Sequence, residues 1–107
     1  MAWFFCPYLQ SQVELTEERA KHLVEHHPDF NVGYERYIAT VLEDPDQIRR
    51  SAHSPSARLF SRWFPELRGG KFVVVVVNDS EFDERYWVVT AYMTRRLSKG
   101  ECEWERN

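Results

Sequence analysis

Five consecutive valines, at positions 73–77, constrain the fold of this chain more than any other feature. Valine is branched at Cβ, and this branching favours strands over helices. A strand with one face in water would alternate apolar and polar residues, whereas this run is apolar at every position. The run therefore predicts a central strand that is apolar on both sides.

Helical signals precede the valines. Thr16 suits a helix N-cap, Glu17 and Glu18 suit the first turn of that helix, and Pro28 ends it near His27. A second helix is predicted after "DFNVG", because apolar residues recur at helical spacing until Asp44-Pro45 stops them. Its apolar stripe consists of Tyr34, Tyr37, Ile38 and Val41.

Strand signals follow the helices. "QIRRSA" predicts a short edge strand, "RLFSRWF" and "RYWVVTAYMT" predict alternating strands, and "PELRGG" and "NDSEFDE" predict a turn and a hairpin loop. The predicted fold is α+β, with two N-terminal helices packed on one face of an antiparallel sheet of about four strands. "WFFCPYL" and "ECEWE" are candidates for further short strands. The length of 107 residues, 43% of them apolar, predicts a single domain.

Strand alternation predicts which side chains face away from the helices. One set in each alternating strand is assigned to the core: Leu59, Ser61 and Trp63 in the first, and Trp87, Val89, Ala91 and Met93 in the last. The opposite face would then carry arginines and aromatic rings, which pair with phosphates and stack on unpaired bases. An ordinary wet face is the alternative. The residues predicted on this face are Arg58, Phe60, Arg62, Phe64, Tyr86, Val88, Thr90, Tyr92 and Thr94.

The charge is unevenly distributed. A formal net charge of −3 disfavours a nucleic-acid partner, but the stretch from Gln47 to Phe72 is basic, with Glu66 as its only carboxylate. Such asymmetry predicts an anion-binding stripe, and a solvated basic face is the alternative. The cations of this stretch are Arg49, Arg50, Arg58, Arg62, Arg68 and Lys71.

Three histidines lie in "HLVEHHPDF", residues 22–30. At 100° per residue, His27 points toward the core, His26 borders the core-facing stripe and His22 lies nearly opposite. A histidine at a buried helix end is as often a hydrogen-bonded core residue as a catalyst. His22 and His26 could hold a divalent metal, but Glu25 points elsewhere and leaves them without a third ligand. The carboxylates of "VLEDPD" and "NDSEFDE" are interpreted as caps and turn formers.

The two cysteines, Cys6 and Cys102, belong to no zinc-binding spacing. A disulfide between them is the alternative to two free thiols. No leader and no apolar run of membrane-spanning length is visible, so we expect a cytoplasmic protein with free thiols and no membrane partner.

Five short motifs follow one another between about residues 15 and 94: His22 with His27-Pro28-Asp29, Pro45-Asp46-Gln47-Ile48, the basic stretch Arg58 to Arg62, the valines, and Val88-Val89-Thr90-Ala91-Tyr92. Their order resembles the phage-associated branch of the barnase, EndoU, colicin and RelE-like nuclease fold, whose members are small toxins or modules of phage proteins. The resemblance implies a metal-independent endoribonuclease that needs no cofactor.

In that chemistry the ribose 2′-oxygen attacks the adjacent phosphate, an acid protonates the leaving 5′-oxygen and a cation stabilises the phosphorane. The resemblance implies proton transfer by His22 or His27 and a cation from Arg58 or Arg62. It also implies phosphate binding by Thr90 and Tyr92, with Tyr92 a candidate proton donor. The residues expected to bind RNA are Arg49, Arg50, Phe60, Arg62, Phe64, Lys71 and Tyr86.

The resemblance also implies a partner, because such toxins are paired with an antitoxin. The acidic tail "ECEWERN" and the loop "NDSEFDE" are the candidate contacts for an antitoxin or for a second copy of the chain in a homodimer. A non-enzymatic module of the same fold, binding RNA or protein through the same sheet face, is the alternative function.

Overall fold

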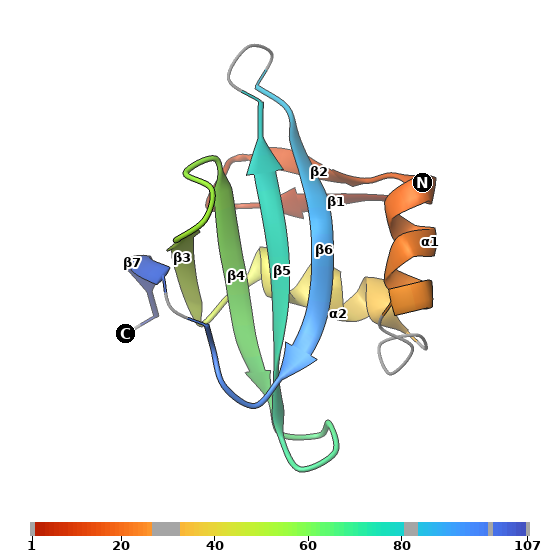
Figure 1. The fold of residues 1–107 in the computed structure, drawn as a ribbon, viewed down its shortest axis with the longest axis vertical. Coiled ribbons are helices and arrows are strands. Elements are labelled where there is room, and N and C mark those ends of the chain that lie inside the picture. The colour runs from red at the N-terminus through yellow and green to blue at the C-terminus, as the bar shows by residue number, and fades with distance from the viewer. Residues whose placement is uncertain (1, 27–32, 81–83, 99, 107) are drawn as a thin grey trace.

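The computed structural model describes residues 2–26, 33–80, 84–98 and 100–106. Two helices and seven strands are found in these residues (Figure 1). The helices are α1 (Glu17–His26) and α2 (Tyr34–Glu43). The strands are β1 (Ala2–Cys6), β2 (Ser11–Leu15), β3 (Gln47–Ser51), β4 (Ala57–Phe64), β5 (Lys71–Asp79), β6 (Tyr86–Thr94) and β7 (Gly100–Glu105).

The strands form one mixed sheet in the order β1-β2-β6-β5-β4-β3-β7. Neighbouring strands are antiparallel except β2 and β6, which run parallel over a short pairing. The prediction of about four antiparallel strands behind two N-terminal helices is therefore wrong. The four strands predicted after residue 46 form the centre, but β2 and β1 extend one side, β7 extends the other, and two strands precede the helices.

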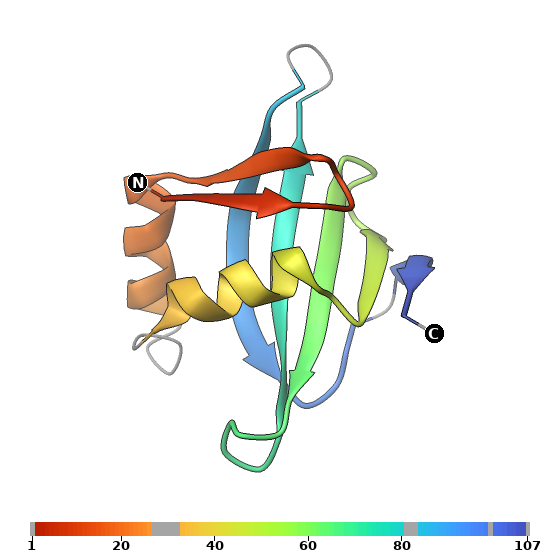
Figure 2. The same ribbon diagram turned by 180° about the vertical axis from the view of Figure 1, so that it is seen from behind.

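The elements are arranged in layers around the central strands. Figure 2 shows α2 and the β1–β2 hairpin crossing the same face of β4, β5 and β6, while α1 stands beside β6. We call the face of β3–β6 beneath α2 and the hairpin the covered face, and its opposite the open face. Strand register assigns Gln47, Arg49, Leu59, Ser61, Trp63, Phe72, Val74, Val76, Thr90, Tyr92 and Thr94 to the open face.

The core lies between the covered face and the layer formed by α2 and the hairpin. Phe60 of β4, Val75 of β5 and Ile38 of α2 are all fully buried there. Val74 is also fully buried although it belongs to the open face. The prediction that the valine run forms a central strand is confirmed, since β5 lies between β4 and β6.

Both predicted helices are present. The hydroxyl of Thr16 accepts a hydrogen bond from the amide of Arg19 at 3.2 Å, as an N-cap should. Helix α2 ends at Glu43, directly before Asp44-Pro45. The predicted end of α1 at His27 lies outside the described residues.

The predicted orientation of β4 is wrong. Phe60 is 0% exposed and Phe64 6% exposed on the covered face, while Trp63, predicted in the core, is 40% exposed on the open face. This orientation places the rings of Phe60 and Phe64 in the core beneath α2 and the hairpin and leaves only Trp63 substantially exposed. Arg58 and Arg62 therefore also lie on the covered face.

A β-bulge changes the alternation of β6. Val76 pairs with Thr90 but Val77 pairs with Val88, so Val89 is an extra residue in this strand. The bulge turns Val88 and Tyr86 to the covered face, where both pack with the core, contrary to the prediction. Thr90 and Tyr92 follow the extra residue Val89 in the chain and lie on the open face as predicted.

Two simpler predictions concern the cysteines and membrane segments. Cys6 and Cys102 are both free thiols, as expected. In the part of the chain that the structure describes, neither helix has the length and apolar character needed to cross a bilayer.

Candidate functional site on the open face

A buried arginine lies on the open face. Arg49 of β3 pairs with Leu59 of β4, and its side chain therefore points away from α2. Arg49 is only 4% exposed. Its Nε and Nη2 atoms are buried and have no hydrogen-bond partner within the described ranges. An unsatisfied buried polar group costs about 1–3 kcal/mol, and a charged one costs more, so Arg49 is the residue of this face whose position most needs a functional explanation.

The electrostatics of Arg49 suit an anion. Burial lowers the pKa of its guanidinium, while the phenol of Tyr92 and the thiol of Cys102 act in the opposite direction. Arginine nevertheless remains charged in proteins, since its pKa lies far above neutral. The N–H bonds at Nε and Nη2 are parallel along one edge of the guanidinium. That edge matches two oxygens of a carboxylate or phosphate.

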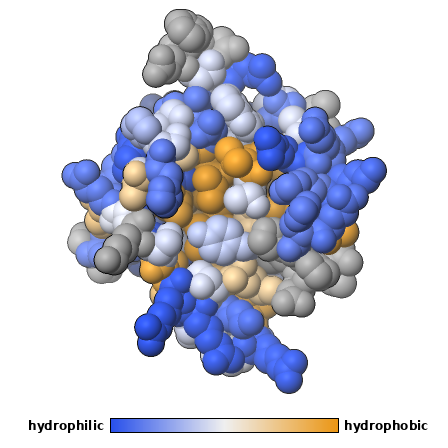
Figure 3. All heavy atoms as spheres, viewed as in Figure 1, coloured by the Kyte–Doolittle hydropathy of each residue, from blue (hydrophilic) through white to orange (hydrophobic). Residues whose placement is uncertain are grey.

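The surroundings of Arg49 are largely apolar. In successive strands the row across the open face reads Arg49, Leu59, Val76 and Thr90. Figure 3 shows an apolar patch in the middle of this face, surrounded by hydrophilic residues. The attraction between opposite charges is stronger next to such an apolar patch than in water.

The row next to that of Arg49 and Thr90 contains the hydroxyl groups of Ser61 and Tyr92. It consists of Gln47, Ser61, Val74 and Tyr92. Ser61 is fully buried, and its hydroxyl donates to the carbonyl of Gln47 at 3.3 Å. Thr90 and Tyr92 are both partly exposed. Arg49, Thr90 and Tyr92 therefore share one face of the sheet, where Tyr92 acts on the guanidinium of Arg49 and Thr90 lies three strands away from it.

Arg58 and Arg50 belong to an ion cluster instead. The Nε of Arg58 donates to Glu103 at 2.8 Å and its Nη1 to Asp79 at 3.3 Å. Arg50 donates to the other oxygen of Glu103 at 2.6 Å, and the hydroxyl of Tyr8 also donates to Glu103, at 2.8 Å. Burial alone would raise the pKa of the Glu103 carboxyl, but hydrogen bonds from Arg58 and Tyr8 outweigh it and leave that pKa lowered.

This ion cluster fastens β7 to β3, β4 and the turn after β1. Glu103 of the tail segment is therefore engaged within the chain, whereas Glu101, Trp104 and Glu105 of that segment are exposed. Glu103 is enclosed by the cluster, and Arg106 pairs with Asp44 and Asp46. The loop "NDSEFDE" lies partly outside the described residues.

The remaining residues predicted to bind RNA lie on the covered side. Arg62 donates to the carbonyl and the carboxylate of Asp44 at 2.7 and 2.8 Å, which anchors the end of α2. Phe60, Phe64 and Tyr86 pack in or against the core. The prediction that these residues form one surface with Tyr92 is therefore wrong, because they lie on the covered face and Tyr92 lies on the open face.

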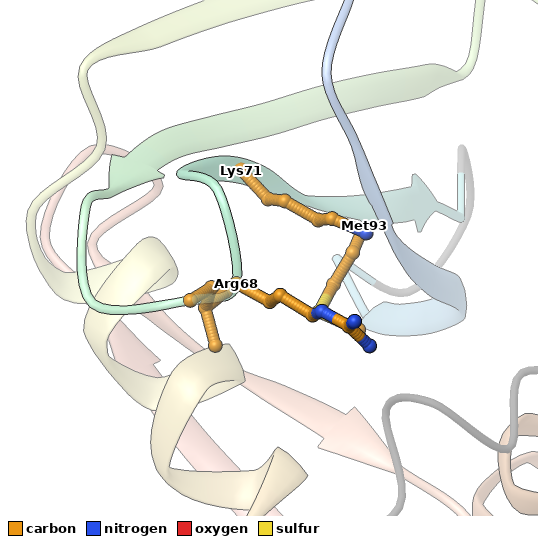
Figure 4. A pocket seen from close by; sticks show the side chains of 4 residues that line it. Arg68, Lys71 and Met93 are labelled. Carbon is orange, nitrogen blue, oxygen red and sulfur yellow. The ribbon is translucent and has the colours of Figure 1, made fainter.

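Lys71 also lies away from the open face. It pairs with Phe64 and lines a hollow with Leu67, Arg68 and Met93. Figure 4 shows the side chains of Arg68 and Lys71 extending toward Met93. This hollow is basic, but its cations are separated from Arg49 by the thickness of the sheet.

His22 and His26 of α1 are not part of the open face either. The rings of His22 and His26 lie 4.1 Å apart between centroids, and His22 lines a surface hollow together with other residues of α1. His27 lies outside the described residues. No group of three or more histidine, cysteine, aspartate or glutamate side chains in the described residues is arranged to hold a metal ion.

Sequence reasoning included Arg49 only as one of several basic residues. Strand alternation gives a more specific prediction. If the side chain of Ile48 faces the core, the side chain of Arg49 faces the opposite side of the sheet, away from the elements that cover the core. Cys102 was missed as a neighbour of Arg49, because its position depends on the pairing of β7 with β3.

Comparison with known proteins adds no relative, since no protein-family model, no curated protein and no solved structure matches this chain.

Proposed function

We propose that this protein is a metal-independent endoribonuclease whose reacting phosphate binds on the open face beside Arg49 and Tyr92. The observation that supports this most is the buried guanidinium edge of Arg49, which has no partner among the described residues. A phosphodiester offers two non-bridging oxygens to such an edge. The motif order, which resembles that of small ribonucleases, supports RNA as the source of the phosphate.

The cleavage step assigns a role to each residue of the open face. The ribose 2′-oxygen forms a bond to phosphorus as the bond from phosphorus to the 5′-oxygen breaks, and the 2′-hydroxyl proton passes to water. The phenol of Tyr92 gives its proton to the departing 5′-oxygen and regains one from water. Arg49 stabilises the added negative charge of the phosphorane, and Thr90 donates a hydrogen bond to the phosphate. The products are a 2′,3′-cyclic phosphate and a 5′-hydroxyl.

The cation in this proposal is Arg49, because Arg58 and Arg62 are paired with carboxylates on the covered side. Proton transfer by His22 has no place in it, since that histidine lies on α1 among its own helix neighbours.

The test is incubation of the protein with total cellular RNA in excess EDTA, followed by mapping of new 5′-hydroxyl and cyclic-phosphate ends. We expect Arg49→Leu to reduce cleavage by about 10²- to 10³-fold, the usual effect of losing one donor to the transition state. Tyr92→Phe should reduce cleavage by about 10²-fold or more through loss of the proton donor.

Two variants serve as controls. Arg36→Leu removes an exposed arginine of α2, and His22→Ala removes the histidine of α1; both should cleave at the rate of the unaltered protein. Cleavage that survives Arg49→Leu, or that disappears in His22→Ala, would overturn the proposal.

A non-enzymatic RNA-binding module is the second candidate. The exposed apolar surface of Trp63 and the partly exposed Val76 favour it, because such surface suits contact with nucleobases without any chemistry. This function predicts RNA that is retained without new ends, with retention lost in Arg49→Leu.

A further inference from the structure

An aromatic pair lies at one end of the open face. Trp63 of β4 is directly opposite Phe72 of β5, with ring centroids 4.9 Å apart and ring planes at 70°. Trp63 is 40% exposed. The indole of Trp63 therefore packs against the ring of Phe72 in a T-shaped arrangement and exposes part of its own surface to solvent.

The backbone holds this indole in place. A Cβ at Gly70 would lie 2.3 Å from Cζ2 of Trp63, so the ring rests against the main chain of Gly70, which has a φ of 74°. The amide of Trp63 donates to the carboxylate of Asp46 at 2.8 Å. A ring fixed in this way loses little conformational entropy when a ligand stacks on it.

The pair lies close to the proposed phosphate site. Trp63, Phe72 and Thr94 form the row next to that of Ser61, Val74 and Tyr92. Adjacent rows on one face are about 7 Å apart, so Trp63 lies one row from Tyr92 and two rows, or about 14 Å, from the row of Arg49. About two to four nucleotides of a single strand span two rows, since successive phosphates are separated by at least about 3.4 Å along a strand axis.

Cations surround this end of the face. Arg95 follows β6, and its Nη2 lies 3.0 Å from where a Cβ of Gly69 would be, next to the glycine that supports Trp63. The hydroxyl of Thr94 donates to the carbonyl of Arg96 at 2.8 Å and accepts from its amide at 3.3 Å, which orders this turn. Residues 95–98 add the cations Arg95 and Arg96 and contain no carboxylate, whereas Arg68 and Lys71 line the hollow on the other side of the sheet.

We infer that Trp63 and Phe72 form a base-stacking subsite for an unpaired nucleotide of single-stranded RNA. The stacked base lies within about four nucleotides of the phosphate held by Arg49, and Arg95 pairs with a neighbouring backbone phosphate. A base inside a duplex has both faces covered by its neighbours, so the subsite selects single strands, loops and ends. This inference rests on the proposed function and assigns its substrate class.

The test measures binding by fluorescence anisotropy with two short labelled oligomers. One is a single-stranded 2′-O-methyl oligoribonucleotide, which cannot be cleaved by 2′-oxygen attack, and the other is an abasic oligomer of the same length and charge. Stacking on one aromatic side chain contributes about 1–3 kcal/mol, or about 5- to 150-fold in affinity. Trp63→Ala should weaken binding of the first oligomer by that factor and leave binding of the abasic one unchanged.

Two controls sharpen the comparison. Trp63→Phe keeps a ring and should retain most of the affinity, and Trp3→Ala removes another exposed tryptophan, on β1, and should change neither oligomer. If Trp63→Ala weakens both oligomers equally, or neither, the stacking subsite is wrong.

Arg49→Leu in the same assay separates this inference from the function on which it rests. Normal binding by Arg49→Leu, together with a base-dependent loss in Trp63→Ala, would retain the subsite and reject the phosphate site. Loss of binding in Arg49→Leu with no effect of Trp63→Ala would do the reverse.

Discussion

At the scale of single residues, Arg49 and Arg58 illustrate how position decides the role of the same side chain. The two occupy adjacent strands but opposite faces of the sheet. Arg58 bonds to two carboxylates, those of Glu103 and Asp79. Arg49 is more deeply buried and has two guanidinium nitrogens without partners in the described residues. Arg58 therefore stabilises the fold, whereas Arg49 lowers the stability of the protein when no ligand pairs with its guanidinium.

This contrast predicts opposite effects on the free energy of unfolding. Arg49→Leu removes a buried charge without a partner, so stability should stay the same or rise by about 1–3 kcal/mol. Arg58→Leu leaves two carboxylates unpaired, and stability should fall by about 1–3 kcal/mol. Urea unfolding of both variants provides the measurement. If Arg49→Leu is as destabilising as Arg58→Leu, then Arg49 has a structural role and the site is rejected.

Residue identity alone could not separate these two roles. The sequence correctly placed Thr90 and Tyr92 opposite the core, and alternation around Ile48 could have isolated Arg49. It could not reveal the partner of Arg58, because Glu103 lies 45 residues away in β7. A carboxylate that distant becomes a neighbour only through the pairing of β7 with β3.

At the scale of elements, the orientation of β4 determines which side chains are available for function. Both of its faces contain large apolar side chains: Phe60 and Phe64 on one, Leu59 and Trp63 on the other. Alternation therefore predicts a strand but does not choose its buried face. The choice is made by what packs above it, since α2 and the hairpin contact the face with Phe60.

The orientation of β4 can be tested by truncating one ring on each face. Phe60→Ala should destabilise the protein by about 3–5 kcal/mol, because a fully buried ring is removed from the core. Trp63→Ala should cost only about 1–2 kcal/mol, since that indole is partly in water. Chemical denaturation of the two variants shows which of them loses more free energy of unfolding. A larger loss for Trp63→Ala would support the orientation predicted from the sequence and contradict the structure.

Other features of the sheet leave little trace in the sequence. The bulge in β6 falls between Val88 and Thr90, where two identical valines conceal which residue is extra. Strand β2, "SQVEL", is short and pairs in parallel with a strand more than 70 residues later in the chain. Local periodicity predicts helices and long strands well, but such non-local pairings depend on the whole fold.

At the scale of the whole molecule, the two faces of the sheet have separate tasks. The covered face buries the core beneath α2 and the β1–β2 hairpin, and the ion cluster around Glu103 secures its margin. The open face presents Arg49, Thr90 and Tyr92 over an apolar floor, with Trp63 and Phe72 at one end. The valine run serves both faces, since Val73, Val75 and Val77 belong to the core and Val74 and Val76 to the floor.

That alternation provides the most direct test of the claim that the open face binds RNA. The measurement is a nuclear magnetic resonance titration of the protein with the uncleavable single-stranded oligoribonucleotide, following the valine methyl signals and the Nε–H signal of Arg49. We predict shift changes at Arg49 Nε and at the methyls of Val74 and Val76, with those of Val73, Val75 and Val77 unchanged. Shifts confined to α1 around His22, or to the hollow of Arg68 and Lys71, with Arg49 unmoved, would contradict the account.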